Sequence, residues 1–341
     1  MKAMRFHGDG ELRLDDIPTP EPGPGDVLLA PHVVGICGTD AHIVAGHYPS
    51  KPPVVLGHEV SAVVVGVGKD VRSLVEGDLV TVEPHLYCRT CTYCRTGMEH
   101  MCPGKRAPGV HLDGGMAERL VVPEHIAYRL PDGTNAEHGA LVEPLACCVH
   151  AMDRLEVRSG LPFVIFGCGP AGSLLIGLAR LAGLGPIVAV DPKPSRQRLA
   201  RTMGADVVLE PGPGLDEHIM ELTGGIGAPY VVDAVGSGAV LENAIRVAGR
   251  SARILVFGVA DAAATATVRP NEIYAKELTL LGTAINPFTH HRAMHLLHRL
   301  PLDAWNTVSF PLDRLDDALV AQAAGDADKV LLTPQIVGGR S

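Results

Sequence analysis

The sequence predicts an α/β protein in two main parts, a β-rich region followed by a doubly wound parallel sheet. Short β-branched runs broken by Gly and Pro fill the chain up to about residue 143. After residue 159 the pattern changes to alternating strands and helices, which is typical of a parallel sheet covered by helices. A length of 341 residues also suits two hydrophobic cores better than one.

The β-rich region covers residues 1–149 and is expected to form short strands. Its apolar runs are rich in β-branched residues and are bounded by Gly, Pro or charged residues, as strands and their turns usually are. We expect strands at Val27–Leu29, Val60–Val67, Leu79–Val82 and Arg119–Val122.

Residues 150–286 are expected to form the parallel sheet. Six short apolar runs predict strands, and helical periodicity lies between the first five of them. The expected strands are Phe163–Phe166, Ile187–Val190, Val207–Leu209, Tyr230–Asp233, Ile254–Phe257 and Leu278–Leu281. The expected helices are Ala171–Ala182, Ser195–Met203, Leu215–Leu222 and Ala239–Val247.

The last part of the chain, residues 287–341, changes pattern again. Thr289–Leu300 is expected to be a helix, and Lys329–Thr333 a closing strand. We expect this part to return and pack on the first region.

Composition and patterning exclude several classes of protein. Hydrophobic residues make up 46% of the chain, which disfavours disorder, and the net charge of −9 argues against a nucleic-acid binder. Charges scattered through Met1–Asp15 leave no apolar run for a secretory signal. The uncharged run Ser159–Ala179 contains prolines and glycines, so a strand, a turn and a helix explain it better than a membrane span does. We therefore expect a soluble protein that binds neither nucleic acid nor membrane.

A glycine-rich turn follows the first strand of the expected parallel sheet. The segment FVIFGCGPAG places Gly167, Gly169 and Gly172 in a G-x-G-x-x-G pattern, and Pro170 and Ala171 open the next helix. The first glycine permits the tight turn, the second lets a pyrophosphate approach, and the third lets the helix pack on the sheet. The turn therefore predicts a dinucleotide site at a helix N-terminus.

A carboxylate in the expected place strengthens this interpretation. Asp191 ends the second strand, about 20 residues after the last glycine, where an acidic side chain binds the ribose hydroxyls of a dinucleotide. It favours NAD over NADP, although Lys193 and Arg196 are close enough to weaken that preference. We also expect Arg196, Val235 and Val259 to contact the cofactor.

Four of the eight cysteines lie within one short segment. Their C-x2-C-x2-C-x7-C spacing matches a closed tetrahedral zinc site, whereas a bacterial iron–sulfur run has three residues before its last cysteine. No recognition helix follows, as a nucleic-acid-binding zinc finger would require. Such a cluster suits a reducing cytoplasm better than a disulfide framework does. The four residues are Cys88, Cys91, Cys94 and Cys102.

Three further motifs carry potential metal ligands. They are GICGTDAH around Cys37, GHE around His58, and VEPLA around Glu143. Taken singly, each residue has a structural explanation, namely a small buried thiol, a core histidine and a surface carboxylate. In combination with a dinucleotide site they indicate a catalytic zinc, which needs few protein ligands and one open position.

These motifs, together with GGMAE at Gly114–Glu118, resemble the zinc-dependent medium-chain dehydrogenase/reductase family over essentially the full length. The resemblance implies a GroES-like catalytic domain with a structural zinc lobe at about residues 85–105, and an NAD-binding Rossmann domain. It implies Cys37 and His58 as catalytic zinc ligands and Glu59 as a ligand in some states. Glu143 stands where the alcohol dehydrogenase branch has a cysteine and the polyol dehydrogenase branch a glutamate, bound directly or through water.

The same resemblance implies the roles of the neighbouring polar residues. Asp40 is expected to orient His58, while Thr39 and His42 match the positions that relay a proton from the substrate to solvent. Two zinc ions per chain and a homodimer or homotetramer are expected. Cys147, Cys148 and Cys168 remain as packing residues.

The sequence is less informative about the substrate. Glu143 and the segment LGTAINPFTHHR resemble sugar-alcohol and sugar-acid dehydrogenases, so we expect oxidation of a secondary hydroxyl in a polyol or sugar derivative. An L-threonine dehydrogenase-like enzyme or a general secondary alcohol dehydrogenase is the alternative, and a non-catalytic zinc- and nucleotide-binding protein a remote one. His47, Tyr48 and Phe288 are either pocket residues or structural.

Overall fold

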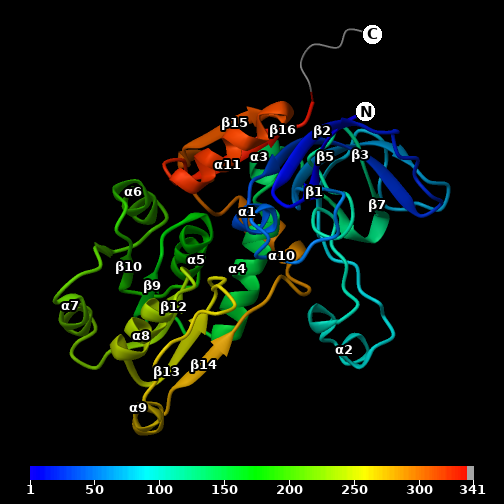
Figure 1. Cartoon of the computed structure of the whole chain (residues 1–341). Helices are drawn as coiled ribbons and strands as arrows, with labels where there is room; N and C mark the ends of the chain where they lie inside the picture. Colours follow the sequence, from blue (N-terminus) through cyan, green and yellow to red (C-terminus); the bar gives the residue numbers. More distant parts are fainter. Residues whose placement is uncertain (336–341) are drawn as a thin grey trace. The chain divides into compact units, whose positions relative to one another are not determined.

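The computed structural model describes residues 1–335 of the chain (Figure 1). The chain divides into two compact units, which are described separately below. The first comprises Met1–Pro144, His290–His298 and the described residues from Asn306 onward. The second comprises Leu145–Thr289 and Arg299–Trp305.

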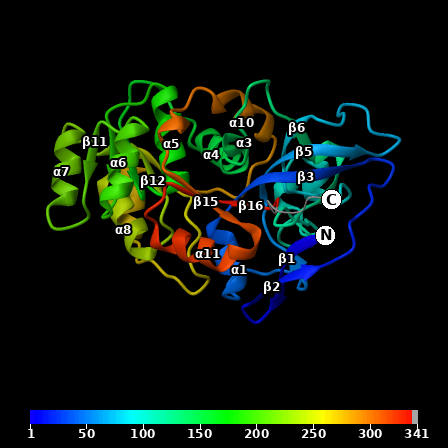
Figure 2. The ribbon, with the colours of Figure 1, turned by 90° about the horizontal axis from the view of Figure 1, so that it is seen from above.

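The first unit is built on a seven-stranded, mainly antiparallel sheet. Its strand order is β15-β16-β3-β5-β6-β8, with β7 also paired to β3, and β3, β5 and β6 lie side by side in Figure 2. The strands are β3 (Asp26–Gly35), β5 (Glu59–Val67), β6 (Leu79–Val82), β7 (Leu120–Pro123), β8 (Ala127–Arg129), β15 (Thr307–Pro311) and β16 (Lys329–Thr333).

A smaller sheet and several short helices complete this unit. The sheet has the order β2-β1-β4, from β1 (Lys2–Gly8), β2 (Glu11–Asp16) and β4 (Val54–Val55). The helices are α1 (Gly38–Val44), α2 (Thr92–Arg95), α3 (Ala136–Gly139), α10 (His290–Leu297) and α11 (Leu315–Ala324), with short 3-10 turns at Glu99–Met101, Glu124–Ile126 and Leu312–Arg314.

Alternation along the central strands creates the core of the first unit. In β5, the side chains of Val60, Ala62 and Val64 are each at most 1% exposed, and they pack with Val27 and Leu29 of β3. Antiparallel pairing aligns Gly35, the last residue of β3, with Glu59, the first residue of β5. This register brings together the segments that follow β3 and precede β5.

The second unit contains a six-stranded sheet in which every pairing is parallel. Its order is β11-β10-β9-β12-β13-β14 (Figure 1). The chain adds β10 and β11 on one side of β9 and then β12, β13 and β14 on its other side, so the order in which strands are added reverses between β9 and β12. Ligands bind at such a reversal, beyond the carboxyl ends of the strands. The strands are β9 (Phe163–Phe166), β10 (Ile187–Val190), β11 (Val207–Leu209), β12 (Ala228–Asp233), β13 (Ala248–Val256) and β14 (Thr279–Gly282).

Helices alternate with these strands along the chain. They are α5 (Pro170–Leu181), α6 (Pro194–Thr202), α7 (Leu215–Leu222), α8 (Gly238–Val247) and α9 (Pro270–Lys276), with a 3-10 turn at Leu302–Ala304. A longer helix, α4 (Val142–Leu155), precedes β9. Buried apolar side chains of β9, β10, β12 and β13 form the core with residues of α7 and α8.

The predicted fold class is confirmed, since a parallel Rossmann-like sheet and an antiparallel GroES-like sheet are both present. The largest difference in this sheet is β13, which begins at Ala248 instead of the predicted Ile254. The uncharged run from residue 159 to 179 forms β9, the glycine turn and most of α5, as predicted. In residues 1–335, the structure contains no helix long and apolar enough to cross a bilayer.

Candidate active site and zinc sites

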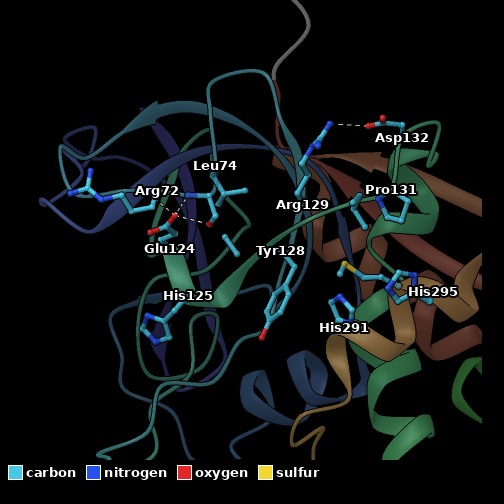
Figure 3. Close-up of a pocket in the computed structure, with 14 residues that line it drawn as sticks. Arg72, Leu74, Glu124, His125, Tyr128, Arg129, Pro131, Asp132, His291 and His295 are labelled. Carbon is cyan, nitrogen blue, oxygen red and sulfur yellow. Dashed lines mark hydrogen bonds and ion pairs between the residues drawn. The ribbon is translucent and has the colours of Figure 1, made fainter.

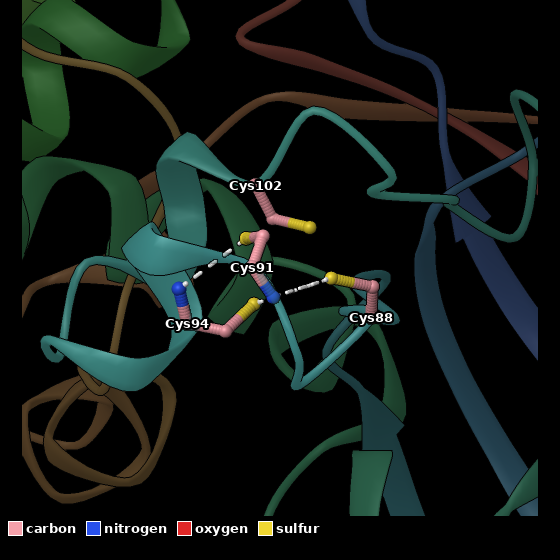
Figure 4. Close-up of side chains that lie close together, drawn as sticks. All are labelled: Cys88, Cys91, Cys94 and Cys102. Atoms are coloured by element: carbon pink, nitrogen blue, oxygen red, sulfur yellow. Dashed lines mark hydrogen bonds between the residues drawn. The ribbon is translucent and has the colours of Figure 1, made fainter.

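The four clustered cysteines form one compact set of sulfur ligands. The Sγ atoms of Cys88, Cys91, Cys94 and Cys102 all lie within 4.8 Å of one another (Figure 4). Cys91 caps the short helix α2, where its Sγ accepts a hydrogen bond from the backbone amide of Cys94 at 3.5 Å. The amide of Cys91 donates in turn to Cys88 Sγ at 3.3 Å.

The surroundings of Cys88 favour its thiolate form, whereas burial and the neighbouring thiols raise the pKa of Cys94 to about 12. Hydrogen bonds from Thr90, through its backbone and side chain, and from the Cys91 amide lower the pKa of Cys88 to about 5. Thiolates are the form in which cysteines bind zinc. A set of four sulfur atoms without an open position is the donor set of a structural zinc site.

A second set of ligands lies in the first unit, where β3 ends and β5 begins. Ligand atoms of Cys37, His58 and Glu59 lie within 4.8 Å of one another. Cys37 is the N-cap of α1, two residues after β3, whereas Glu59 is the first residue of β5. The Gly35–Glu59 register therefore assembles this site from residues far apart in the sequence.

The turn that presents His58 depends on a glycine. Gly57 has φ +91°, a conformation that favours glycine. A Cβ atom there would also lie 2.7 Å from the Met116 side chain and 2.8 Å from that of Val34. Any other residue at this position would move the backbone that carries His58.

Asp40 holds both neighbouring ligands in place. Its carboxylate is fully buried, and Oδ2 accepts a hydrogen bond from the Cys37 amide at 2.9 Å. Oδ1 lies 3.5 Å from Nδ1 of His58, so Nε2 is the ring nitrogen that remains for a metal. Burial lowers the pKa of His58, but the charge of Asp40 and contacts with Cys37 outweigh it and hold this pKa well above its ordinary value.

A buried lysine faces the third ligand. Lys329, the first residue of β16, forms an ion pair with Glu59 Oε2, and their side chains are only 4% and 1% exposed. Burial lowers the pKa of Lys329, but the negative charges of Glu59, Cys37 and Asp40 together raise it by more, so this pKa lies above its ordinary value. The strand is fixed there by a hydrogen bond from the amide of Ile36 to the carbonyl of Val330, at 2.9 Å.

Lys329 was not among the residues predicted for this site. A single lysine before an apolar strand carries no sign of burial, since lysine is among the residues least often buried. Nothing in the sequence marked Gly35 as a residue of this site either, yet a Cβ atom on it would overlap the carboxylate of Glu59. The Gly35–Glu59 contact depends on the pairing of β3 with β5, and the position of Lys329 depends on the pairing of β16 with β3, in which Leu331 faces Gly35.

The remaining predicted residues of this site occupy α1 and α4. Glu143 is the second residue of α4 and is 7% exposed, but it is not a member of the ligand set found within 4.8 Å. Thr39 Oγ1 lies 3.7 Å from Cys37 Sγ, next to the ligands. His42, three residues along the same helix, is exposed to solvent.

Chemically, this donor set fits zinc. It offers a buried imidazole, a buried carboxylate and a partly buried thiol, and zinc binds each of these groups. Asp40 places a carboxylate oxygen 3.5 Å from the second nitrogen of His58, on the side where metal-binding histidines normally have an acceptor. This set has three ligands, whereas the cysteine set has four. Three protein ligands leave one coordination position of zinc open, and an open position distinguishes a catalytic zinc site from a structural one.

The predicted cofactor residues lie at the carboxyl end of the parallel sheet. Gly167 follows β9 with φ +95°, and a Cβ atom on Gly172 would overlap the carbonyl oxygen of Gly167. Gly169 caps α5, Pro170 and Ala171 form its first turn, and a Cβ on Gly169 would meet nothing within 4 Å. The helix N-terminus therefore has room for an anion next to it.

Asp191 shapes the same edge of the sheet. Its Oδ2 accepts from the Cys168 amide at 2.8 Å, inside the glycine turn, and its Oδ1 accepts from the Lys193 amide at 2.9 Å. The Arg196 guanidinium lies 3.9 Å from Oδ2. Val235 and Val259, beyond the ends of β12 and β13, are 51% and 68% exposed.

Comparison with known proteins decides the family. Residues 23–132 match the alcohol dehydrogenase GroES-like domain, and residues 170–299 match the zinc-binding dehydrogenase domain. The chain is 32% identical to L-threonine 3-dehydrogenase of Pyrococcus horikoshii, over 97% of both chains. It belongs to the zinc-dependent medium-chain dehydrogenase/reductase superfamily.

Two other members of the superfamily are similar along the whole chain. Sorbitol dehydrogenase of Bombyx mori is 32% identical over 98% of both chains. The structure of a zinc-binding dehydrogenase of Sinorhizobium meliloti, bound to NADP, superposes with a TM-score of 0.94 at 34% identity, and covers 98% of this chain and 99% of that one. The chain is therefore a zinc-dependent oxidoreductase of this superfamily, with a four-cysteine zinc site.

Proposed function

We propose that this dehydrogenase oxidises a secondary hydroxyl of a polyol or sugar-derived substrate to a ketone, with hydride transfer to the nicotinamide of NAD. The observation that carries the substrate class is Glu143, a buried carboxylate at the first turn of α4 where other branches use a thiol. The similarity to Bombyx mori sorbitol dehydrogenase supports the same class.

Four residues of the first unit would hold the catalytic zinc. They are Cys37 and His58, Glu143 bound directly or through water, and Glu59 as a ligand only in some states, so that one coordination position stays open for the substrate. When bound, zinc supplies a Lewis acid that lowers the pKa of the substrate hydroxyl. With the four-cysteine site, this gives two zinc ions per chain.

Residues of α1 would carry the proton away from the substrate. The Thr39 hydroxyl lies beside the ligand set and can accept the proton of the substrate hydroxyl while donating its own. His42 is exposed, so its imidazole can pass a proton on to water. Asp40 acts by fixing His58 and Cys37, so it is a positioning residue.

We propose NAD as the preferred cofactor, bound by the second unit. The carboxylate of Asp191 would accept from the adenosine ribose hydroxyls and would repel a 2′-phosphate. The Sinorhizobium meliloti protein was solved with NADP, and Arg196 offers a positive charge near the same position, so the preference needs a direct test. The turn would bind through Gly167, Gly169, Pro170, Ala171 and Gly172, with Val235 and Val259 beside the nicotinamide half.

A second substrate class is L-threonine. It is favoured by the 32% identity to the Pyrococcus horikoshii enzyme, which is as high as that to the sorbitol dehydrogenase. Oxidation of either substrate would use the same zinc site and the same cofactor site. Only L-threonine would also require the pocket to bind a carboxylate and an amine.

One experiment separates these candidates. The purified protein, with its zinc content measured, is assayed for NADH and NADPH formation with polyols, sugar acids, L-threonine and simple alcohols. The proposal expects the highest kcat/KM for a polyol or sugar derivative with NAD. A higher value for L-threonine would replace the polyol assignment, and turnover that survives Cys37→Ser would refute the proposed zinc site.

Three further proposals concern the whole protein. We expect domains at 1–149, 150–286 and 287–341, and limited proteolysis with mass spectrometry would locate the boundaries. We expect a homodimer or homotetramer, because β14 is an edge strand of the six-stranded sheet and Leu280 on it is exposed, as is Tyr274 of α9. Light scattering would measure the mass. None of the eight cysteines, all of which lie within residues 1–335, forms a disulfide, and this supports a cytoplasmic location.

A further inference from the structure

We propose that His291 and His295 form a third metal site, a bidentate site for a divalent transition-metal ion on the surface of the first unit. The two histidines are four residues apart in α10, a spacing that places side chains on the same face of a helix. Their rings are in contact, with centroids 4.7 Å apart at an interplanar angle of 73° (Figure 3).

Both imidazoles are available to a ligand. They are exposed, and within residues 1–335 neither has a hydrogen bond or an ion pair to the protein. The two neighbouring histidines differ in this respect. Nε2 of His290 is buried 3.4 Å from Thr81 Oγ1, and Nε2 of His298 lies 3.2 Å from Thr134 Oγ1. Among these four histidines, His291 and His295 are therefore the two exposed ones with neither ring nitrogen hydrogen-bonded within residues 1–335.

A cavity gives an ion access to this pair. His291 and His295 line a cavity of about 760 Å³ together with Tyr128 and residues of the segment 129–132 (Figure 3). The positive charge of Arg129, on the same wall, is balanced by Asp78 at 3.1 Å and Asp132 at 2.9 Å. The cavity leaves room for the water molecules that would complete the coordination of the ion.

The chemistry of the pair selects the class of ion. Imidazole suits Zn²⁺, Ni²⁺ and Cu²⁺, whereas Mg²⁺ and Ca²⁺ require oxygen ligands. Metal–nitrogen bonds of about 2.0–2.1 Å need the two ring nitrogens to approach within about 3–3.5 Å of each other. Rotation of two exposed side chains is sufficient for this approach, because exposed rotamers interconvert freely. The i, i+4 histidine pair of zinc metalloproteases uses the same helical spacing.

The proposal is tested with Ni²⁺ and untagged full-length protein that already holds its zinc. Calorimetry and equilibrium dialysis with metal analysis measure the number of Ni²⁺ ions bound and their affinity. We expect one ion per chain in the wild type, and a loss of affinity of about tenfold or more in both His291→Gln and His295→Gln, because each removes one arm of the chelate.

The matched control is His218→Gln. His218 is an exposed histidine of α7 that has no histidine four residues away on either side, so its loss should leave the Ni²⁺ affinity unchanged. Circular dichroism and an unchanged zinc content establish that each variant is folded. Wild-type protein that binds no Ni²⁺, or a single variant that retains the wild-type affinity, would overturn the proposal.

Discussion

The buried ion pair between Lys329 and Glu59 allows a quantitative prediction. Replacing Lys329 by Met keeps the length of the side chain but leaves the Glu59 carboxylate buried without its partner. Because the two side chains are only 4% and 1% exposed, we expect a loss of about 3–5 kcal/mol in the free energy of unfolding. With a urea m-value of about 3 kcal/mol per M, the unfolding midpoint should fall by about 1 M or more.

A surface lysine provides the matched control for this prediction. Lys276 pairs with Glu272 at 3.0 Å, but their side chains are 27% and 26% exposed, so Lys276→Met should cost at most about 1 kcal/mol. Urea unfolding followed by circular dichroism measures both variants. The double variant Glu59→Gln with Lys329→Met should be more stable than the sum of the single losses predicts, because it removes both charges. Equal midpoints for Lys329→Met and Lys276→Met would refute the reasoning.

Three other predictions concern the positioning residue, the glycine turn and the cysteine site. Asp40→Asn should weaken zinc binding at the catalytic site by about 10- to 100-fold, measured by competition with a chelator, while the zinc at the four-cysteine site remains. Gly172→Ala should lower the melting temperature because its Cβ would overlap the Gly167 carbonyl, whereas Gly169→Ala should leave the melting temperature unchanged and weaken only NAD binding, measured by fluorescence titration. Cys102→Ser should release one zinc per chain in metal analysis and leave the second zinc bound, and retention of both zincs would contradict the structural-site assignment.

The parallel sheet was the part of the fold most accessible from the sequence. Its central strands are buried on both faces, so runs such as Phe163–Phe166 and Ile187–Val190 are apolar without interruption, and their predicted bounds agree with the structure. The glycine pattern located the turn after β9 because a left-handed φ at Gly167 and the close approach at Gly172 both restrict residue type.

The first unit was harder to predict, because its elements depend on contacts between distant segments. The hairpin of β1 and β2 was not predicted, because charged residues interrupt the apolar residues of both strands. Both strands belong to a small sheet in which β2 is largely exposed or partly exposed. Helix α1 was not predicted either, although Cys37, Asp40 and His42 were singled out, because its seven residues are too few for a clear helical period. Lys329 was assigned only as the start of a strand, and its contact with Glu59 required the pairing of β16 with β3.

The position of Lys329 has a consequence for the order in which the protein assembles. Glu59 emerges early during synthesis, whereas the buried lysine that pairs with it lies on β16, the last described strand to leave the ribosome. A nascent chain that has not yet reached β16 therefore carries a Glu59 carboxylate without its lysine partner, and burying this carboxylate requires a metal ion or a proton. Synthesis of β16 and completion of the Glu59 site are in this way coupled, and a chain that ends before Lys329 should lack the stabilisation that the ion pair provides.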